Sequence, residues 1–335
     1  MQLKNLIIFD GSYCLHRALK QQNLWLLRNS ELERTGGIFG FLNIFKKEIQ
    51  LMGNYFPIVC WDDGQSDRRL SIYDNYKKHR EKLEDPNNIP FSQMTDEQLD
   101  EDYVYNYKLQ RKKLIELLNA FGVPNLLFKH TEGDDLMYWL SRHCEKCKVV
   151  TDDRDLLQLI TENCVIRQAM KDRVVDMKLL KEEYNVDTVD EFIKTKAFLG
   201  DGSDNIPSAC KGVGEKSVKD FFEVYESLKL QNKTGYFLDE EILKAYCKEN
   251  GYKFKKAYLN FDENRYLDNL ELVDLRKIQD DEINEEGIYD AIRRVYKNKV
   301  VHRPLELLNK YEIKTVNTNV IFEAIILARH NIKDN

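Results

Sequence analysis

Short apolar runs alternate with segments of helical periodicity along the first half of the chain. Five of these runs have the length and composition of buried strands, and they lie at residues 6–9, 56–61, 125–128, 148–150 and 164–166. This alternation predicts an α/β fold with a mostly parallel central sheet flanked by helices. In such folds ligands bind beyond the carboxyl ends of the strands, so the polar residues that follow each run are the first candidates for a functional site.

The pattern changes twice further along the chain. Residues 78–110 lose apolar periodicity and carry two prolines and many acids, which predicts a mobile excursion from the domain. A helical pattern then resumes and is expected to end at Gly122. Beyond residue 190 helical patterns dominate, so we expect an α/β core at 1–190 and a helical region at 191–335.

Composition excludes several classes of protein. The chain has 335 residues, of which 42% are hydrophobic and 32% charged, and this rules out collagen-like, disordered and disulfide-scaffold proteins. Asp10 interrupts the first apolar stretch before it could form a signal peptide, and no run of about eighteen apolar residues occurs, so we expect a cytoplasmic protein. Seven cysteines favour reduced thiols, and the pair Cys144 and Cys147 lacks the second ligand pair that structural zinc requires.

Acidic residues gather at the predicted strand ends and helix starts. Oxygen ligands suit hard cations such as Mg²⁺ or Mn²⁺, and each ion takes only one or two carboxylates, so many acids predict more than one ion. Paired divalent ions can stabilise the attacking and leaving oxygens of a phosphodiester displacement. The nine candidate metal ligands are Asp10, Asp62, Glu132, Asp134, Asp135, Asp153, Asp155, Asp201 and Asp204.

Each acidic group also has a simpler interpretation. Glu132, Asp134 and Asp135 could complement a helix N-terminus, where an anion gains about 0.3–1 kcal/mol. Asp201 and Asp204 could be turn residues beside glycine. Capping does not explain why four groups lie at one predicted sheet edge, where unneutralised carboxylates would repel one another, and this favours bound cations.

Two local segments suit nucleic acid, although a net charge of −6 excludes a basic field over the whole protein. Residues 67–80 mix five cations, Lys78 among them, with two tyrosines; cations follow a single-stranded backbone while rings stack on bases. Residues 211–222 form a glycine turn before a lysine-bearing helix, whose backbone amides could hold a phosphate. A solvated helix face and a plain interhelical turn remain the alternatives. The residues of the second segment are Gly212, Gly214, Lys216 and Lys219.

Five motifs follow one another in the chain: IIFDGS, VCWDD with the basic YKKHR, EGDD, TDDRDLLQL, and GDGSDNIP leading into KGVGEKS. In this order they resemble the structure-specific 5′ nuclease family of flap endonucleases and 5′ to 3′ exonucleases, most of all its bacteriophage ribonuclease H or flap exonuclease members and bacterial polymerase-associated domains. The resemblance covers about residues 4–225. It implies a PIN-like 5′ nuclease core, a helical arch at about 78–110 and a helix-hairpin-helix-type turn at 205–222, with an uncharacterised tail.

The resemblance also implies roles for individual residues. The nine acids match the family's metal ligands, which implies two or more Mg²⁺ or Mn²⁺ ions, and relatives carry K⁺ at the helical turn. Lys77 matches a lysine near the scissile phosphate, and Arg80 matches the basic residue after it, so both are expected to be catalytic. Arg17 and Tyr76 match residues that contact nucleic acid.

The activity implied is divalent-metal-dependent hydrolysis of phosphodiesters near the 5′ end of branched or duplex DNA, in replication or repair. Removal of RNA primers is a further candidate activity. A PIN-type endoribonuclease and a non-catalytic DNA-structure-binding protein remain alternatives. We expect the protein to be a monomer. Its expected partners are DNA with a 5′ flap, nick or single-strand/duplex junction, an RNA–DNA hybrid, and replication proteins.

Overall fold

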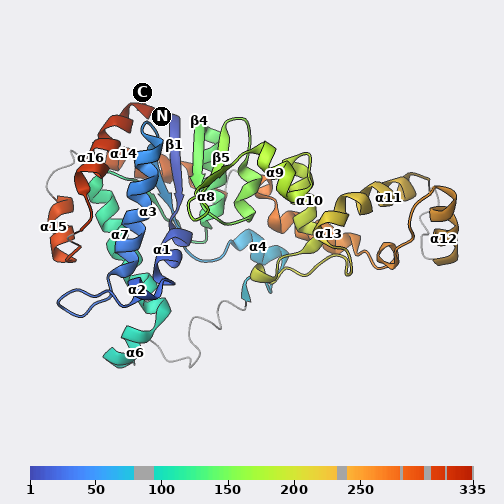
Figure 1. The fold of residues 1–335 in the computed structure, drawn as a ribbon, viewed down its shortest axis with the longest axis horizontal. Coiled ribbons are helices and arrows are strands. Elements are labelled where there is room, and N and C mark those ends of the chain that lie inside the picture. Colours follow the sequence, from blue (N-terminus) through green and yellow to red (C-terminus); the bar gives the residue numbers. More distant parts are fainter. Residues whose placement is uncertain (79–93, 232–239, 280–281, 298–302, 314, 334–335) are drawn as a thin grey trace. The chain divides into compact units, whose positions relative to one another are not determined.

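The computed structural model describes residues 1–78, 94–231, 240–279, 282–297, 303–313 and 315–333 (Figure 1). The chain forms two compact units, each built from separated stretches of sequence. The first comprises residues 1–67, 80–176 and 278–335, and the second comprises residues 68–79 and 177–277. None of the helices within the described ranges has both the length and the hydropathy that a membrane span requires.

The first unit is built on one mostly parallel sheet. Its strands are β1 (Gln2–Asp10), β2 (Phe56–Cys60), β3 (Asn125–Leu126), β4 (Cys144–Val150), β5 (Cys164–Gln168), β6 (Arg173–Val175) and β7 (Ile332–Lys333). The order is β3-β2-β1-β4-β5-β6, with β7 pairing to β1. The five strands expected from the sequence are all present and parallel, which confirms the predicted fold class. The antiparallel strands β6 and β7 were not expected, because three and two residues are too few to show a period.

Helices cover both faces of this sheet. In β1, Ile7 and Phe9 face the layer formed by α3 and α7, while Leu6 and Ile8 alternate onto the opposite face, where α8 packs on the strands. Figure 1 shows α3, α7 and α16 side by side. The helices of this unit are α1 (Gly11–Leu19), α2 (Gln22–Trp25), α3 (Gly36–Met52), α6 (Asp96–Glu101), α7 (Tyr103–Phe121), α8 (Gly133–His143), α14 (Glu285–Lys297), α15 (Arg303–Lys310) and α16 (Thr318–Ala328). Short 3₁₀ helices lie at Asp155–Leu159 and Arg329–Asn331.

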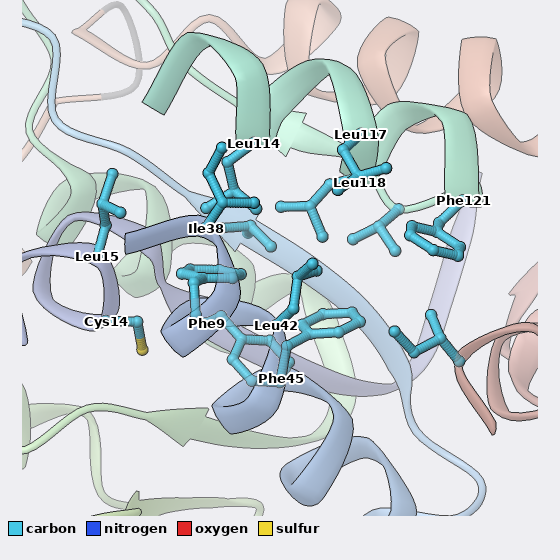
Figure 2. Packing of buried hydrophobic residues seen from close by; sticks show 14 of the residues in the cluster. Phe9, Cys14, Leu15, Ile38, Leu42, Phe45, Leu114, Leu117, Leu118 and Phe121 are labelled. Atoms are coloured by element: carbon cyan, nitrogen blue, oxygen red, sulfur yellow. The ribbon is translucent and has the colours of Figure 1, made fainter. Parts of the chain in front are cut away.

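The core between sheet and helices is aromatic and aliphatic. Figure 2 shows Phe9 of β1 against Phe45 of α3, and the two ring centroids are 4.8 Å apart. Leu114, Leu117 and Phe121 close the same core from α7, all fully buried. Each such side chain contributes about 1.5–3 kcal/mol on burial, so this layer holds the carboxyl ends of the strands in place.

Helix α7 begins earlier than its apolar pattern indicates. Asp102 caps it by accepting a hydrogen bond from the Tyr105 backbone amide. Asn106 and Gln110 are buried polar residues on its inner face, and Gln110 Oε1 accepts from the Ile38 amide at 3.2 Å. Residues 96–101 and 103–110 are helical, whereas residues 79–93 lie outside the described part of the chain, so the helical arch expected at about 78–110 stays a prediction.

The second unit is mainly helical. Its helices are α4 (Asp67–Ile72, whose first residue belongs to the first unit), α9 (Met177–Tyr184), α10 (Val189–Leu199), α11 (Val218–Gln231), α12 (Glu240–Glu249) and α13 (Glu263–Val273). Short 3₁₀ helices lie at Gly202–Asp204, Glu215–Ser217, Lys256–Leu259 and Leu275–Lys277. An aromatic cluster around Phe198 and Phe221 forms its core, with ring centroids 4.8 Å apart.

These units divide the chain differently from the expected boundary after residue 190. The second unit begins at Met177 and takes in the distant segment 68–79, whereas residues from Ile278 onward return to the first unit. The return is made by β7 on β1 and by Ile321 and Ile325 of α16 in the core of the first unit. Both are long-range contacts that a local pattern does not reveal.

Candidate functional site

Asp10 is the last residue of β1 and the N-cap of α1. Its Oδ1 accepts a hydrogen bond from the Tyr13 amide at 2.8 Å, and its Oδ2 accepts one from Thr151 Oγ1 at 3.0 Å. Burial, followed by the charge of Asp62, raises the pKa of Asp10 to about 8. A nearby cation would offset both effects, because it favours the ionised carboxylate.

Asp62 lies at the same edge of the sheet. The parallel register pairs Asp10 with Cys60, so Asp62, two residues after β2, emerges beside β1. Asp62 Oδ1 accepts from the Gly133 amide at 2.7 Å. A Cβ on Gly133 would lie 3.2 Å from that oxygen, so the glycine allows the start of α8 to approach the strand end closely.

The start of α8 brings the third acidic group. Glu132 occupies the N-cap position and is buried, with its Oε1 accepting from the Ser66 amide at 3.2 Å. Asp134 and Asp135 fill the first helical turn, where the helix dipole favours negative charge. The capping interpretation and the metal interpretation are thus both compatible with this geometry.

The fourth group follows β4. The Asp153 amide donates to Thr151 Oγ1 at 3.0 Å, and Asp153 Oδ1 accepts from the Asp155 amide at 2.9 Å. The charge of Asp153 also raises the pKa of Asp10, and the Thr151 hydroxyl contacts both the Asp10 carboxylate and the Asp153 amide. Their neighbour Asp152 accepts instead from the Tyr13 hydroxyl at 3.1 Å.

The first unit therefore brings several predicted ligands together. After burial, the charges of Asp10, Asp62 and Asp134 raise the pKa of the Cys60 thiol, which lies among them. Within the described ranges, no three Asp, Glu, His or Cys side chains are arranged to hold one ion among themselves.

Asp201 and Asp204 lie in the second unit, in the loop after α10. Lys196 Nζ lies 3.3 Å from Asp201 Oδ2. Although burial raises the pKa of Asp201, hydrogen bonds from Ser203 and the charge of Lys196 lower it overall. Asp204 Oδ2 lies 3.7 Å from Lys77 Nζ. Both carboxylates thus face lysines of their own unit.

Lys77 and its neighbours also belong to the second unit. The sequence led us to expect that the Tyr76 ring is exposed and stacks on a base. In the structure the ring is buried against Ile206 and Leu272, as part of an apolar cluster. Lys78 is exposed. Arg80 lies outside the described residues. Arg17, in the first unit, is exposed on α1.

The glycine turn has unequal glycines. Gly212 has φ of 83°, a left-handed conformation that favours glycine, whereas Gly214 has φ of −84°, which any residue can adopt. Lys216 is exposed. Lys219 instead forms an ion pair with Asp187, and its Nζ lies 3.8 Å from a Glu191 carboxylate oxygen.

The sequence did not reveal several residues that contact the acidic edge of the sheet, the edge that carries Asp10, Asp62 and Asp153. Arg111 of α7 donates to the Asp62 carbonyl at 2.7 Å and lies 3.7 Å from Asp63. Ser12 Oγ accepts from the Asp62 amide at 3.1 Å. Thr151 bridges two acidic groups, as described above. Only Arg111 had a signal, because it lies in a basic run on a predicted helix.

The fold is that of 5′ nucleases. A solved structure of T5 5'-exonuclease with bound zinc matches with a TM-score of 0.59 and 22% identity, covering 96% of this chain and 100% of that one. A family model described as "5'-3' exonuclease, N-terminal resolvase-like domain" matches residues 5–185, more than half of the chain. The chain therefore belongs to the 5'-3' exonuclease family, which confirms the resemblance found in the sequence.

Two curated relatives show how far the likeness extends. The 5'-3' exonuclease of Aquifex aeolicus is 27% identical over 94% of this chain and 96% of its own length. DNA polymerase I of Caldicellulosiruptor bescii is 31% identical over 67% of this chain, which spans only 25% of that polymerase.

Proposed function

We propose that this protein is a divalent-metal-dependent 5′ nuclease that hydrolyses phosphodiesters near the 5′ end of branched or duplex DNA in replication or repair. The observation that carries the proposal is the acidic edge of the sheet, where Asp10, Asp62 and Asp153 come from three different strand ends. Membership of the 5'-3' exonuclease family supports the reaction, and the Aquifex aeolicus relative of nearly equal length bears that name.

The donor set fits hard divalent cations. All candidate ligands are carboxylate oxygens, and burial followed by the charge of Asp62 raises the pKa of Asp10, both of which a bound cation would offset. When bound, two or more Mg²⁺ or Mn²⁺ ions would make a water nucleophilic and stabilise charge on the phosphate. The residues proposed to hold them are Asp10, Asp62, Glu132, Asp134, Asp135, Asp153 and Asp155, with Asp201 and Asp204 as candidates from the second unit.

The remaining candidate site residues would bind and orient the nucleic-acid strand. Lys77 would place a cation at the scissile phosphate, and Arg17, Lys78 and Arg80 would attract the nucleic-acid backbone. Gly212, Gly214 and Lys216 would hold duplex phosphates at the glycine turn, where K⁺ stays a prediction. Replication proteins as partners, and the monomeric state, also stay predictions.

Carboxamide variants test the metal assignment. Asp153→Asn and Asp155→Asn should abolish cleavage in Mg²⁺ while DNA binding survives, because the change removes charge but keeps side-chain size. Glu145→Gln is the matched control: it removes one carboxylate from the start of β4, the strand whose other end leads to Asp153, and should cleave normally. Cleavage near the wild-type rate in both aspartate variants would contradict the assignment.

The substrate panel tests the reaction class. A labelled set of flapped, nicked and RNA-primed duplexes, and single-stranded RNA, should show products released from 5′ ends of the DNA substrates. Cleavage of RNA alone would identify a PIN-type endoribonuclease instead. Binding of junctions without any cleavage in Mg²⁺ or Mn²⁺ would identify a non-catalytic DNA-structure-binding protein.

A further inference from the structure

The turn that carries Lys77 has an unusual backbone. Lys77 has φ of 52°, in the left-handed region that few non-glycine residues adopt. Such a conformation costs free energy, so it persists only where surrounding contacts impose it. The contacts that impose it are therefore candidates for a positioning role.

Two hydrogen bonds join this turn to the loop after α10. The Lys77 backbone amide donates to the Asp204 carbonyl at 3.0 Å. The Asn205 side-chain amide donates to the Asn75 carbonyl at 2.8 Å. The two bonds connect consecutive loop residues to either side of Tyr76, and all of these residues belong to the second unit.

Side chains reinforce the same attachment. Tyr76 is 2% exposed, packs with Ile206, and donates from its hydroxyl to Asp204 Oδ2 at 3.3 Å. The Lys77 ammonium lies 4.9 Å from the centroid of the Tyr76 ring. Further back, Arg69 Nε donates to the Leu272 carbonyl at 3.0 Å. The segment is thus held at its start by α13 and at its end by the loop.

Asn205 suits this position for two reasons. Its own φ is 60°, and asparagine tolerates that region better than most residues. Its carboxamide also supplies an N–H donor, which aspartate in the same conformation lacks. In this loop it is the Asn205 carboxamide that donates to the Asn75 carbonyl.

We propose that Asn205 is a positioning residue for cleavage, acting by holding the turn that orients Lys77. The inference rests on the proposed function, because it assumes that Lys77 acts on the phosphate. It gives Asn205, a residue of the GDGSDNIP motif, a role in orienting Lys77 rather than in binding a metal ion. The Asn205 side chain would touch neither the DNA nor an ion.

The test is a double-mutant cycle between Asn205 and Lys77. Asn205→Gly keeps the left-handed backbone accessible but removes the donor. It should lower the single-turnover rate at saturating flap substrate about 10- to 100-fold, the loss expected from misplacing a reacting group, with duplex affinity unchanged. In the Lys77→Ala background the same change should have no further effect. An equal slowing in both backgrounds would overturn the inference.

A control and a second measurement separate this inference from the proposed function. Asp74→Asn changes an exposed side chain of the same turn and leaves the Asn75 carbonyl in place, so its cleavage rate should match the wild type. Hydrogen exchange of the peptide spanning residues 73–78 should be faster in Asn205→Gly, because the Lys77 amide loses its constraint. Unchanged hydrogen exchange of this peptide in Asn205→Gly would refute the proposed holding of the turn by Asn205, even if cleavage were slower. If Lys77→Ala cleaved normally, the proposed role of Lys77 would be wrong. The exchange measurement would still test whether Asn205 holds the turn.

Discussion

Thr151 shows how one side chain can organise an acidic site. It is 1% exposed, donates to Asp10 Oδ2 and accepts from the Asp153 amide, both at 3.0 Å. One hydroxyl thus orients a carboxylate of β1 and the loop that follows β4. Asp10 and Asp153 are proposed metal ligands, and loss of a residue that orients metal ligands typically costs about 10- to 100-fold in metal affinity or activity.

We expect Thr151→Val to lower Mg²⁺-dependent cleavage about 10- to 100-fold, because valine keeps the shape but can neither donate nor accept. Mg²⁺ titrations of the cleavage rate would measure it. Thr151→Ser keeps the hydroxyl and should stay within a few-fold of wild type. Equal losses in the serine and valine variants would point to packing of the methyl group instead.

The lysines after the glycine turn should differ in their contribution to DNA binding. Lys216→Ala should reduce the slope of log K against log salt by about 0.9, the value for one lost phosphate contact on duplex DNA. Lys219→Ala should change it less, because Lys219 already pairs with Asp187 and Glu191. Duplex-binding titrations at several salt concentrations would decide. A larger effect for Lys219 would mean that DNA displaces those carboxylates.

At the scale of elements, a buried ion pair joins α3 to the sheet. Glu48 of α3 is fully buried, and Arg167 of β5 donates to it from Nε at 2.8 Å. Arg167 also pairs with Asp172, next to β6. The pair fixes the rotation of a helix whose other residues form the core beneath Asp10. Loss of Glu48 would leave the buried Arg167 with only the exposed Asp172 as its counterion.

Glu48→Gln should therefore lower the free energy of unfolding by less than about 3–5 kcal/mol, the usual cost of leaving a buried charge uncompensated, because Asp172 still pairs with Arg167. Urea unfolding of single and double variants would measure it. The double variant Glu48→Leu/Arg167→Met should recover much of the loss, because it removes both charges. If Glu48→Gln were as stable as wild type, water would be reaching the pair.

At the scale of the whole molecule, the balance of charge predicts a response to metal. The net charge is −6, and several carboxylates converge at one sheet edge. A cation that binds only the folded state stabilises it by mass action, by about 2.7 kcal/mol at 100 times its Kd. The metal assignment can thus be tested without any cleavage assay.

We expect the Tm to be higher in Mg²⁺ than in EDTA at constant ionic strength, and Asp10→Asn to abolish most of that difference. Asparagine can still cap α1, so the variant should remain folded. Thermal unfolding of wild type, Asp10→Asn and the Glu145→Gln control would measure the effect. The same Mg²⁺-dependent shift in Asp10→Asn as in wild type would place the stabilising ion elsewhere.

The local pattern was sufficient for the elements of the core. All five expected strands are present, and Gly122 ends α7 with φ of 89°, as a C-terminal glycine should. Because the carboxyl ends of parallel strands meet at one edge, the sequence alone also brought Asp10, Asp62 and Asp153 to a common site. The period of apolar residues and the direction of each strand depend on residues that are close in sequence, so a local pattern can reveal them.

Only the tertiary structure decided which unit each functional segment joins. Lys77 and Tyr76 follow Asp62 closely in sequence, yet they pack with Asp204 and Ile206, more than a hundred residues away. The same is true of the pairing of Lys219 with Asp187 and of β7 with β1. These outcomes depend on burial and charge pairing between distant residues, and such contacts leave no period along the chain. The sequence by itself therefore determined the strands and the acidic edge, whereas the partners of the basic residues were settled by long-range packing.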